Sequence, residues 1–282
     1  RDLSVESVAL LESEPDAIPT FRGLAVVRDI PDGEHRLTVN GPGVEPHSET
    51  VSVSKEAGGP TTAGVDGRIP LVARENATKL EVDAEASDSD ITDLAVEDDF
   101  AGRLYDAPLH GRDAVYVHRG GAYTTEVRDA DDEVGAYRIN PSDEPRVRLE
   151  APQTGKASLA TYLADVAEET AAAVAAVETR DGTAGESGGG SPTGGRENAV
   201  RGLATALEAV AEAARRAAER AANGERGQAD TNLRTVRDRL ERVQNRLVEA
   251  SGGLPDPVER AVGHRLEQSR RRSEQALAAR KL

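Results

Sequence analysis

FRGLAVVRDIPDGEHRLTVNGPGVEPHSETVSV, residues 21–53, is the stretch that best predicts the fold class of this chain. The Pro31-Asp32-Gly33 segment indicates a tight turn, because proline presets φ and glycine accepts a positive φ. Residues 36–39 and 50–53 alternate polar and apolar side chains, the pattern of half-buried strands. With the apolar positions of 24–30, this predicts three short strands in a small β-sandwich. An apolar run at 8–11 is either an edge strand or the tail of an upstream domain.

The same stretch resembles a known family. The segments IPDGEHRLTV (30–39), GPGVEP (41–46) and TVSV (50–53) are similar to the carboxypeptidase regulatory-like family of transthyretin-like β-sandwich modules. The family has aromatic residues at the positions of His35 and Val44, and this chain does not. The resemblance implies a structural or binding module of the kind common in secreted and cell-surface proteins. It implies no shared active-site residues.

A second β region follows a Gly/Pro/Thr-rich linker at 54–67. Gly120-Gly121 indicates a hairpin between two of its strands. Short strands separated by acidic turns predict an Ig-like sandwich. The candidate strands are 69–73, 79–83, 91–96, 114–118, 123–127, 135–139 and 146–149.

From about residue 153 the apolar spacing changes from two to three and four, which predicts helices. The expected helices are 158–179, 197–223, 230–250 and 257–280, with a flexible linker at 180–195. The regular spacing in 197–250 is typical of an antiparallel bundle or helical hairpin. The chain is therefore expected to be multidomain, β then α. The expected domains are a transthyretin-like module at 1–56, an Ig-like sandwich at 57–152 and a helical bundle at 153–282.

The composition is strongly acidic, with 51 Asp and Glu against 35 Lys and Arg and a net charge of −16. Residues 1–150 hold 32 acids and 15 bases, so the first half carries the whole imbalance. This acidity argues against nucleic acid as a partner of the N-terminal half. High acidity, 31 Arg against 4 Lys and few aromatics resemble proteins of salt-loving archaea. An acidic domain from an ordinary high-GC organism is the alternative.

Several residue types are missing. The absence of Cys excludes disulfides, thiolate metal sites and a cysteine nucleophile. No apolar run is long enough to span a membrane. The absence of Met predicts a mature or excised piece of a longer chain.

Few residues suggest a chemical site. Asp88, Asp90 and Asp93 offer closely spaced carboxylates that suit Ca²⁺, although a solvated acidic turn explains them as well. Asn76 begins an Asn-Ala-Thr glycosylation sequon. The five histidines are scattered, and no catalytic or cofactor-binding residue is predicted; Ca²⁺ is the single candidate cofactor.

These features predict a non-catalytic structural and binding protein at the surface of a halophilic archaeon, with a protein or glycan partner. One alternative is the ectodomain of a membrane-anchored sensor or transport-accessory protein. Another is a hydrolase or carbohydrate-processing enzyme. Residues 197–250 are a candidate oligomerisation element. The Arg270-Arg271-Arg272 run is either a solvated helix face or a contact with an anionic membrane surface.

Overall fold

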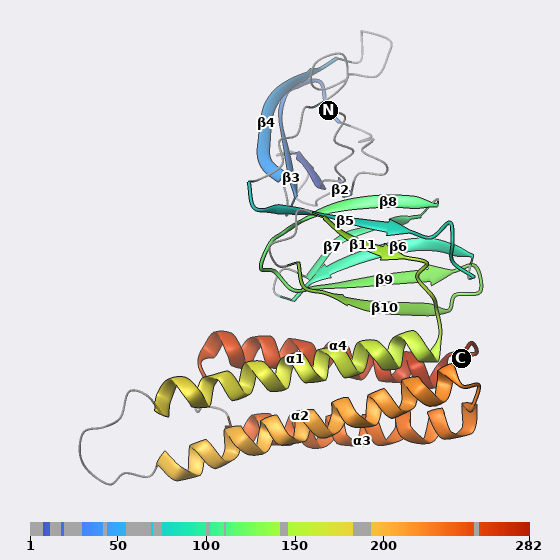
Figure 1. The fold of residues 1–282 in the computed structure, drawn as a ribbon. Coiled ribbons are helices and arrows are strands. Elements are labelled where there is room, and N and C mark those ends of the chain that lie inside the picture. Colours follow the sequence, from blue (N-terminus) through green and yellow to red (C-terminus); the bar gives the residue numbers. More distant parts are fainter. Residues whose placement is uncertain are drawn as a thin grey trace. The chain divides into compact units, whose positions relative to one another are not determined.

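Strands precede helices along the chain, as the sequence predicts (Figure 1). The computed structural model describes residues 8–11, 18–19, 30–41, 44–54, 69, 75–88, 90–99, 102–109, 111–141, 146–182, 193–250 and 254–282. The chain divides into two compact units. Unit 1 comprises residues 1–123 and 139–152, and unit 2 comprises residues 124–138 and 153–282. Unit 2 therefore contains a β segment as well as the helices. The bounds of the three domains expected from the sequence remain a prediction.

The N-terminal sheet has the strand order β2-β1-β3-β4 and is antiparallel in its β1–β2, β1–β3 and β3–β4 pairs. Its strands are β1 (Val8–Leu11), β2 (Ile18–Pro19), β3 (Gly33–Gly41) and β4 (Val44–Val53). Gly33 has a φ of 138°, so the glycine of the predicted turn does take a positive φ. Residues 8–11 do form a strand, but β1 pairs with both β2 and β3 and is therefore not the edge strand that the sequence predicts. The strand expected at 24–30 lies outside the described residues, except for Ile30.

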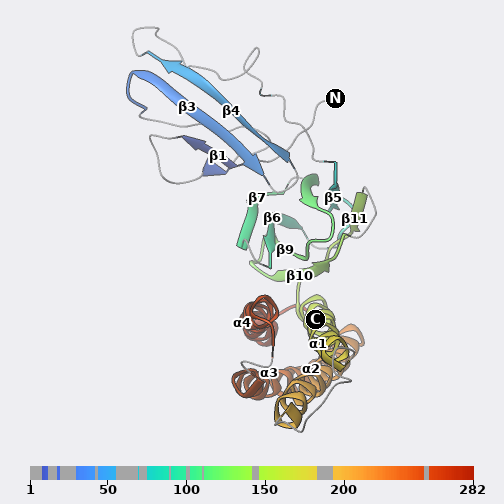
Figure 2. The same cartoon turned by 90° about the vertical axis from the view of Figure 1, so that its left-hand side faces the viewer.

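Two further sheets follow, with strand orders β10-β9-β6-β7 and β11-β5-β8 (Figure 2). β11 pairs with β5 in parallel, and β8 pairs with β5 antiparallel. The strands are β5 (Ala77–Asp83), β6 (Ile91–Asp98), β7 (Gly102–Pro108), β8 (Arg112–His118), β9 (Tyr123–Asp129), β10 (Val134–Ile139) and β11 (Arg146–Glu150). β7 was not predicted from the sequence, and the strand expected at 69–73 lies outside the described residues except for Ile69.

The core of unit 1 is formed by side chains two residues apart on neighbouring strands, as a period of two requires. Its most deeply buried members include Leu80 and Val82, Leu94 and Val96, and Val115 and Val117.

The four helices lie side by side in unit 2 (Figures 1 and 2). They are α1 (Lys156–Gly182), α2 (Thr193–Ala222), α3 (Arg226–Ala250) and α4 (Asp256–Ala278). α1 packs against α2 and α4, and α3 packs against the same two helices. The apolar residues that recur every three or four positions in α2 and α3 are buried, which agrees with the regular spacing of 197–250. In α1, Ala173 is exposed and Val174 is buried. Residues 183–192 of the expected linker lie outside the described part of the chain.

The described helices include none with both the length and the apolar character needed to cross a bilayer.

Candidate functional site

The most unusual feature of unit 2 is a set of buried charged side chains that joins residues 124–138 to α1 and α4. Side chains at alternate positions of β9 point the same way, so Thr124 and Glu126 share one face of the strand. Both are buried, Thr124 completely. We call this set the ionic seam; its members are Glu126, Asp129, Arg138, Lys156, Glu169, Arg265, Arg272 and Lys281.

Glu126 and Arg272 form the most deeply buried pair of the ionic seam. Their Oε2 and Nη1 atoms are 2.6 Å apart, with side chains 8% and 0% exposed. Arg272 also donates to the side-chain oxygen of Gln275 at 2.9 Å. Burial removes the water that would stabilise each charged group. A buried guanidinium and a buried carboxylate are tolerated because each stabilises the charge of the other. The pair therefore fixes β9 against α4.

A second part of the ionic seam centres on Glu169 of α1. Arg138 donates to both carboxylate oxygens of Glu169, from Nε at 2.7 Å and from Nη2 at 3.0 Å. Arg265 of α4 reaches the same carboxylate at 2.6 Å. Such two-pronged arginine contacts are among the strongest hydrogen bonds in proteins. Glu169 thus links β10, α1 and α4.

Asp129 anchors the C-terminal residues. Its carboxylate accepts hydrogen bonds from the Thr154 hydroxyl at 2.5 Å, from Lys281 at 2.6 Å and from the backbone N–H of Asp131 and Glu133. Burial raises the pKa of Asp129, but these hydrogen bonds together outweigh burial and hold it below its ordinary value. The Asp129 contact conversely raises the pKa of Lys281 against the smaller opposing effect of burial.

Lys156 binds the C-terminal end of α4. Its ammonium group donates to the carbonyls of Ala276 and Leu277 at 2.8 and 3.1 Å, and it pairs with Asp230 at 2.9 Å. The last carbonyls of a helix lack partners inside the helix and carry partial negative charge, so a cation there is favourable. The side chain of Lys156 is 1% exposed.

A chain of hydrogen bonds between uncharged and histidine side chains lies beside the ion pairs of the ionic seam. Tyr162 of α1 bonds to Thr124 at 3.0 Å and donates to Gln268 of α4 at 3.2 Å, and Gln268 contacts His264 at 3.0 Å. The charged members of the ionic seam are each matched by an opposite charge. Chemically, the arrangement acts as a set of fixed cross-links.

The structure does not gather the predicted Ca²⁺ ligands into a coordination site. Asp88 and Asp90 are exposed, and Asp93 lies in β6, where it accepts a hydrogen bond from Thr92 at 2.7 Å. Within the described residues, no three His, Asp or Glu side chains are arranged to hold a metal ion. A Ca²⁺ site at these aspartates remains a prediction.

Asn76 lies in the exposed turn before β5, and its amide contacts the Nε2 atom of His118 at 2.5 Å. Thr78, the third residue of the sequon, is fully buried. Glycosylation at Asn76 also stays a prediction. His110 lies outside the described residues.

The ionic seam was not predicted from the sequence. The run Arg270-Arg271-Arg272 was interpreted as a single solvated face or membrane contact. A solvated face fits Arg270 and Arg271, which are exposed, but is wrong for Arg272, which is buried. The position of Arg272 in the helical repeat of α4 indicates that its side chain is buried. Arg272 follows buried Ser269 by three residues and precedes buried Ala276 by four, which places it on the inner face.

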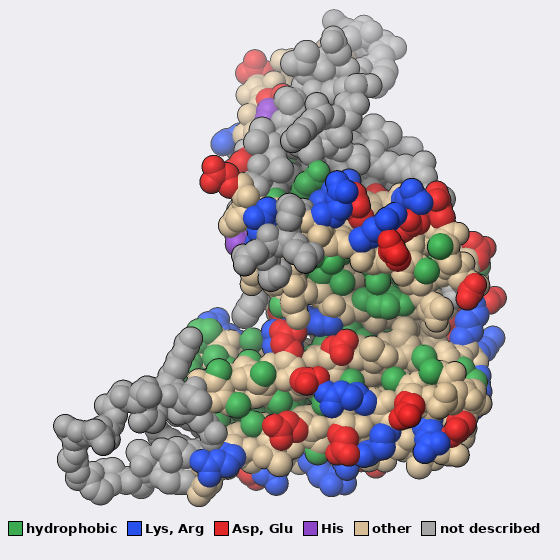
Figure 3. Space-filling view, viewed as in Figure 1, with side chains coloured by type: hydrophobic (Ala, Val, Ile, Leu, Met, Phe, Trp, Pro, Cys, Tyr) green, Lys and Arg blue, Asp and Glu red, His purple; other side chains and the backbone are tan. Residues whose placement is uncertain are grey.

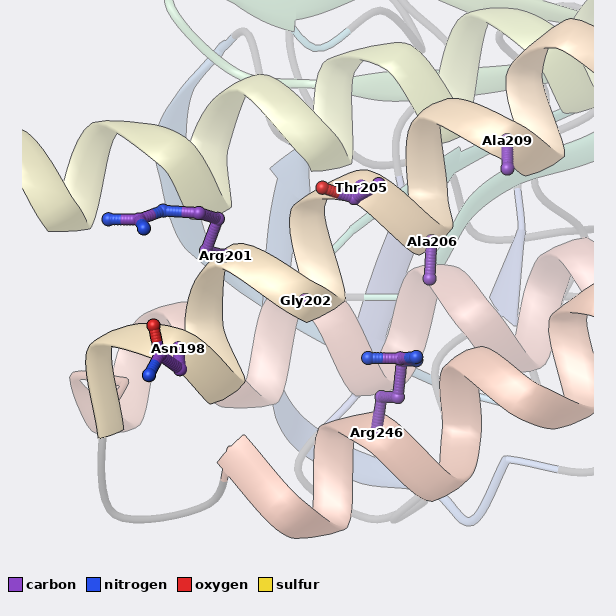
Figure 4. Close-up of a pocket in the computed structure, with 7 residues that line it drawn as sticks. All are labelled: Asn198, Arg201, Gly202, Thr205, Ala206, Ala209 and Arg246. Carbon is purple, nitrogen blue, oxygen red and sulfur yellow. The ribbon is translucent and has the colours of Figure 1, made fainter. Parts of the chain in front are cut away.

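A groove of about 440 Å³ lies between α2 and α3 (Figure 4). Gly202, Ala206 and Ala209 form its floor, and Arg201 and Arg246 flank it. Asn198 and Thr205 complete the lining. A side chain at position 202 would meet the Arg246 guanidinium at 2.6 Å, so the glycine allows this arginine to lie across α2. About two helical turns before Arg246 in α3, Arg239 donates to the carbonyl of Ala209.

No family model matches the sequence, and neither a curated protein nor a solved structure shows significant similarity to it.

Proposed function

We propose that this chain is a non-catalytic structural and binding protein at the outer surface of a halophilic archaeal cell. In this proposal its strands form transthyretin-like and Ig-like sandwich modules that contact a protein or glycan partner. The helices form an antiparallel bundle that serves as a spacer and assembly element. The observation that carries the proposal is the ionic seam, since its charged groups are held in cross-links between strand and helix.

The mechanical consequence of the ionic seam supports a structural role. Glu126, Arg138 and Asp129 of one β segment each bond to residues from α1, α4 or the segment that follows α4. Breaking a buried ion pair leaves a charge without compensation and costs about 3–5 kcal/mol. Several such links make unit 2 resistant to local opening, which suits a spacer under load.

Composition supports the salt requirement. Acidic and basic side chains are interspersed over the helices in Figure 3, yet the whole chain remains at −16. In about 1 M salt the Debye length falls to about 3 Å, so an acidic surface no longer repels itself.

The proposal is tested by immunolabelling intact and lysed cells of the source organism with antibodies against the folded chain. We expect labelling of intact cells, lost after treatment with an external protease, while a cytoplasmic marker stays unlabelled. Labelling that requires lysis would contradict a surface location. If the chain leaves the envelope only with detergent and not with chelator or high salt, the membrane-anchored ectodomain becomes the better explanation.

A further inference from the structure

Residues 280–282, which follow α4, are bonded directly to the first residues of α1 (Figures 1 and 2). The backbone N–H of Lys156 donates to the carbonyl of Lys281 at 3.1 Å, and that of Ala157 donates to the carbonyl of Leu282 at 3.4 Å. The first N–H groups of a helix have no partner within the helix, so these carbonyls satisfy donors of α1. The chain therefore enters and leaves the four-helix bundle at one place.

Residues 280–282 are also bonded to the turn between β9 and β10. Lys281 pairs with Asp129 at 2.6 Å, and the backbone N–H of Arg280 donates to Oε1 of Glu133 at 2.7 Å. Asp129 and Glu133 are both buried. Hydrogen bonds to ionised carboxylates are stronger than those between neutral groups. These contacts attach residues 280–282 to the β segment of unit 2.

Gly155 allows the close approach of these segments. A β-carbon at position 155 would lie 2.9 Å from the carbonyl oxygen of Lys281 and 3.0 Å from that of Leu282. The φ of Gly155 is 106°, which other residues rarely adopt. Its own N–H donates to the carbonyl of Val134 in β10 at 2.9 Å. We call this junction the terminal clamp; its members are residues 129, 133, 155–157 and 280–282.

We propose that the terminal clamp carries tension across unit 2 and keeps the four helices outside the load path. This inference rests on the proposed structural role, in which the helices serve as a spacer under load. Tension between the start of α1 and residues 280–282 passes first through the terminal clamp, because its bonds join these two points directly. The helices lie between the two points in the sequence and bear tension only after the terminal clamp opens.

The load path without the terminal clamp is weaker. Tension would then enter α4 at its C-terminal end, where the hydrogen bonds of successive helical turns break one after another. The ammonium group of Lys156, which binds the carbonyls of Ala276 and Leu277, would be the first cross-link to resist. Forced unfolding depends on the rate of opening, so a local clamp slows it without a matching gain in equilibrium stability.

Single-molecule force measurements on the full chain test the terminal clamp. Because the chain contains no Cys, two introduced thiols give unique attachment points for the handles. In the clamp geometry, the handles are attached to Thr161→Cys, an exposed position in α1, and to a cysteine added after Leu282. In the reference geometry, they are attached to exposed positions of α2 and α3, Glu208→Cys and Val248→Cys, so the load bypasses the terminal clamp.

Two variants should weaken the terminal clamp in the clamp geometry alone. Lys281→Met removes the ion pair with Asp129 and should raise the rupture rate at constant force about tenfold, equivalent to about 1.4 kcal/mol of barrier. Deletion of residues 280–282, with the handle after Ala279, should let the helices extend at a lower force. Both variants should unfold like wild type in the reference geometry.

Arg280→Met is the matched control, because Arg280 contributes its backbone N–H and carbonyl to the contacts of residues 280–282. It removes a neighbouring positive charge and should rupture like wild type in both geometries.

Either weakened variant rupturing at the wild-type rate in the clamp geometry would overturn the inference. Equal acceleration in both geometries would mean that these contacts stabilise unit 2 as a whole, and the inference would fail. Wild-type helices that extend before any clamp rupture would contradict it as well. The force measurements do not depend on where the protein lies in the cell. Labelling of intact cells tests the proposed function separately, so the two can fail independently.

Discussion

At the scale of single residues, the stability of unit 2 depends on buried charged side chains. Arg272→Met should lower the free energy of unfolding by up to about 3–5 kcal/mol, because it removes the buried cation that faces Glu126 and leaves the more exposed Arg128, 3.3 Å away, to compensate that carboxylate. Urea unfolding followed by circular dichroism measures the change. Arg271→Met is the matched control, since Arg271 is the exposed neighbour and should cost no more than about 0.5 kcal/mol.

The partner variant distinguishes a charge effect from a packing effect. Adding Glu126→Gln to Arg272→Met removes the buried negative charge that Arg272 compensates and should recover part of the loss, giving a coupling of about 1–3 kcal/mol. A strictly additive double variant would mean that Arg272 stabilises unit 2 through packing alone.

Asp129 predicts how stability depends on pH. Its folded-state pKa lies below the unfolded value of about 3.9, so its contribution is complete above that value and is lost as pH falls through the folded pKa. Asp129→Asn should cost about 1–2 kcal/mol at neutral pH, an amount reduced by solvent screening because Lys281 is 39% exposed.

Acid titrations of stability test the sign of this effect. The difference between wild type and Asp129→Asn should shrink as pH falls below about 4, because the wild-type carboxyl then takes up its proton. Asp132→Asn, at a 90% exposed position in the same turn, should follow the wild-type curve. A gap that stays constant down to acid pH would show that the Asp129 charge does not contribute.

The residue scale also explains why the ionic seam was not predicted. Charged side chains are usually exposed, so a run of three arginines suggests a surface. The burial of Arg272 depends on a carboxylate that precedes it by well over a hundred residues. That ion pair depends on the tertiary structure, so the local sequence pattern does not predict it.

At the scale of elements, prediction succeeded where one face of an element is continuously apolar. The seam Leu233, Val236, Leu240, Val243 and Leu247 of α3 is regular, and every member is buried. β7 was missed because its sequence, GRLYDAP, places turn-forming Gly, Asp and Pro within a short strand. Its pairing with β6 outweighs those local preferences.

The groove between α2 and α3 gives a prediction about one helix. Gly202→Ala should stabilise α2 by about 0.5–1 kcal/mol, because alanine favours helix and the clashing Arg246 guanidinium is the free end of a flexible side chain. Thermal unfolding measures the gain. Gly263→Ala in α4 is the control, with Leu247 at 4.0 Å as the nearest atom. Destabilisation by Gly202→Ala alone would mean that Arg246 is held rigidly over α2.

At the scale of the whole molecule, the sequence indicated the β-then-α order but not how the chain divides. A composition change near residue 153 suggested a boundary there, yet residues 124–138 group with the helices. The ionic seam and the backbone bond from Gly155 to the Val134 carbonyl, 2.9 Å long, account for that grouping. The local spacing of apolar residues separates strands from helices. It therefore cannot place a strand segment in the same unit as the helices that it contacts.

The net charge of −16 gives the last prediction, since repulsion among the acids opposes the folded state most when salt is low. Raising sodium chloride from about 0.1 to 3 M shortens the Debye length from about 10 Å to below 3 Å. If screening contributes about 3 kcal/mol, the melting temperature should rise by about 6–12 °C. Sucrose at matched water activity is the control, because it strengthens burial without screening charge. An equal rise in sucrose would assign the effect to solvent exclusion, and an unchanged melting temperature in salt would refute the halophilic interpretation.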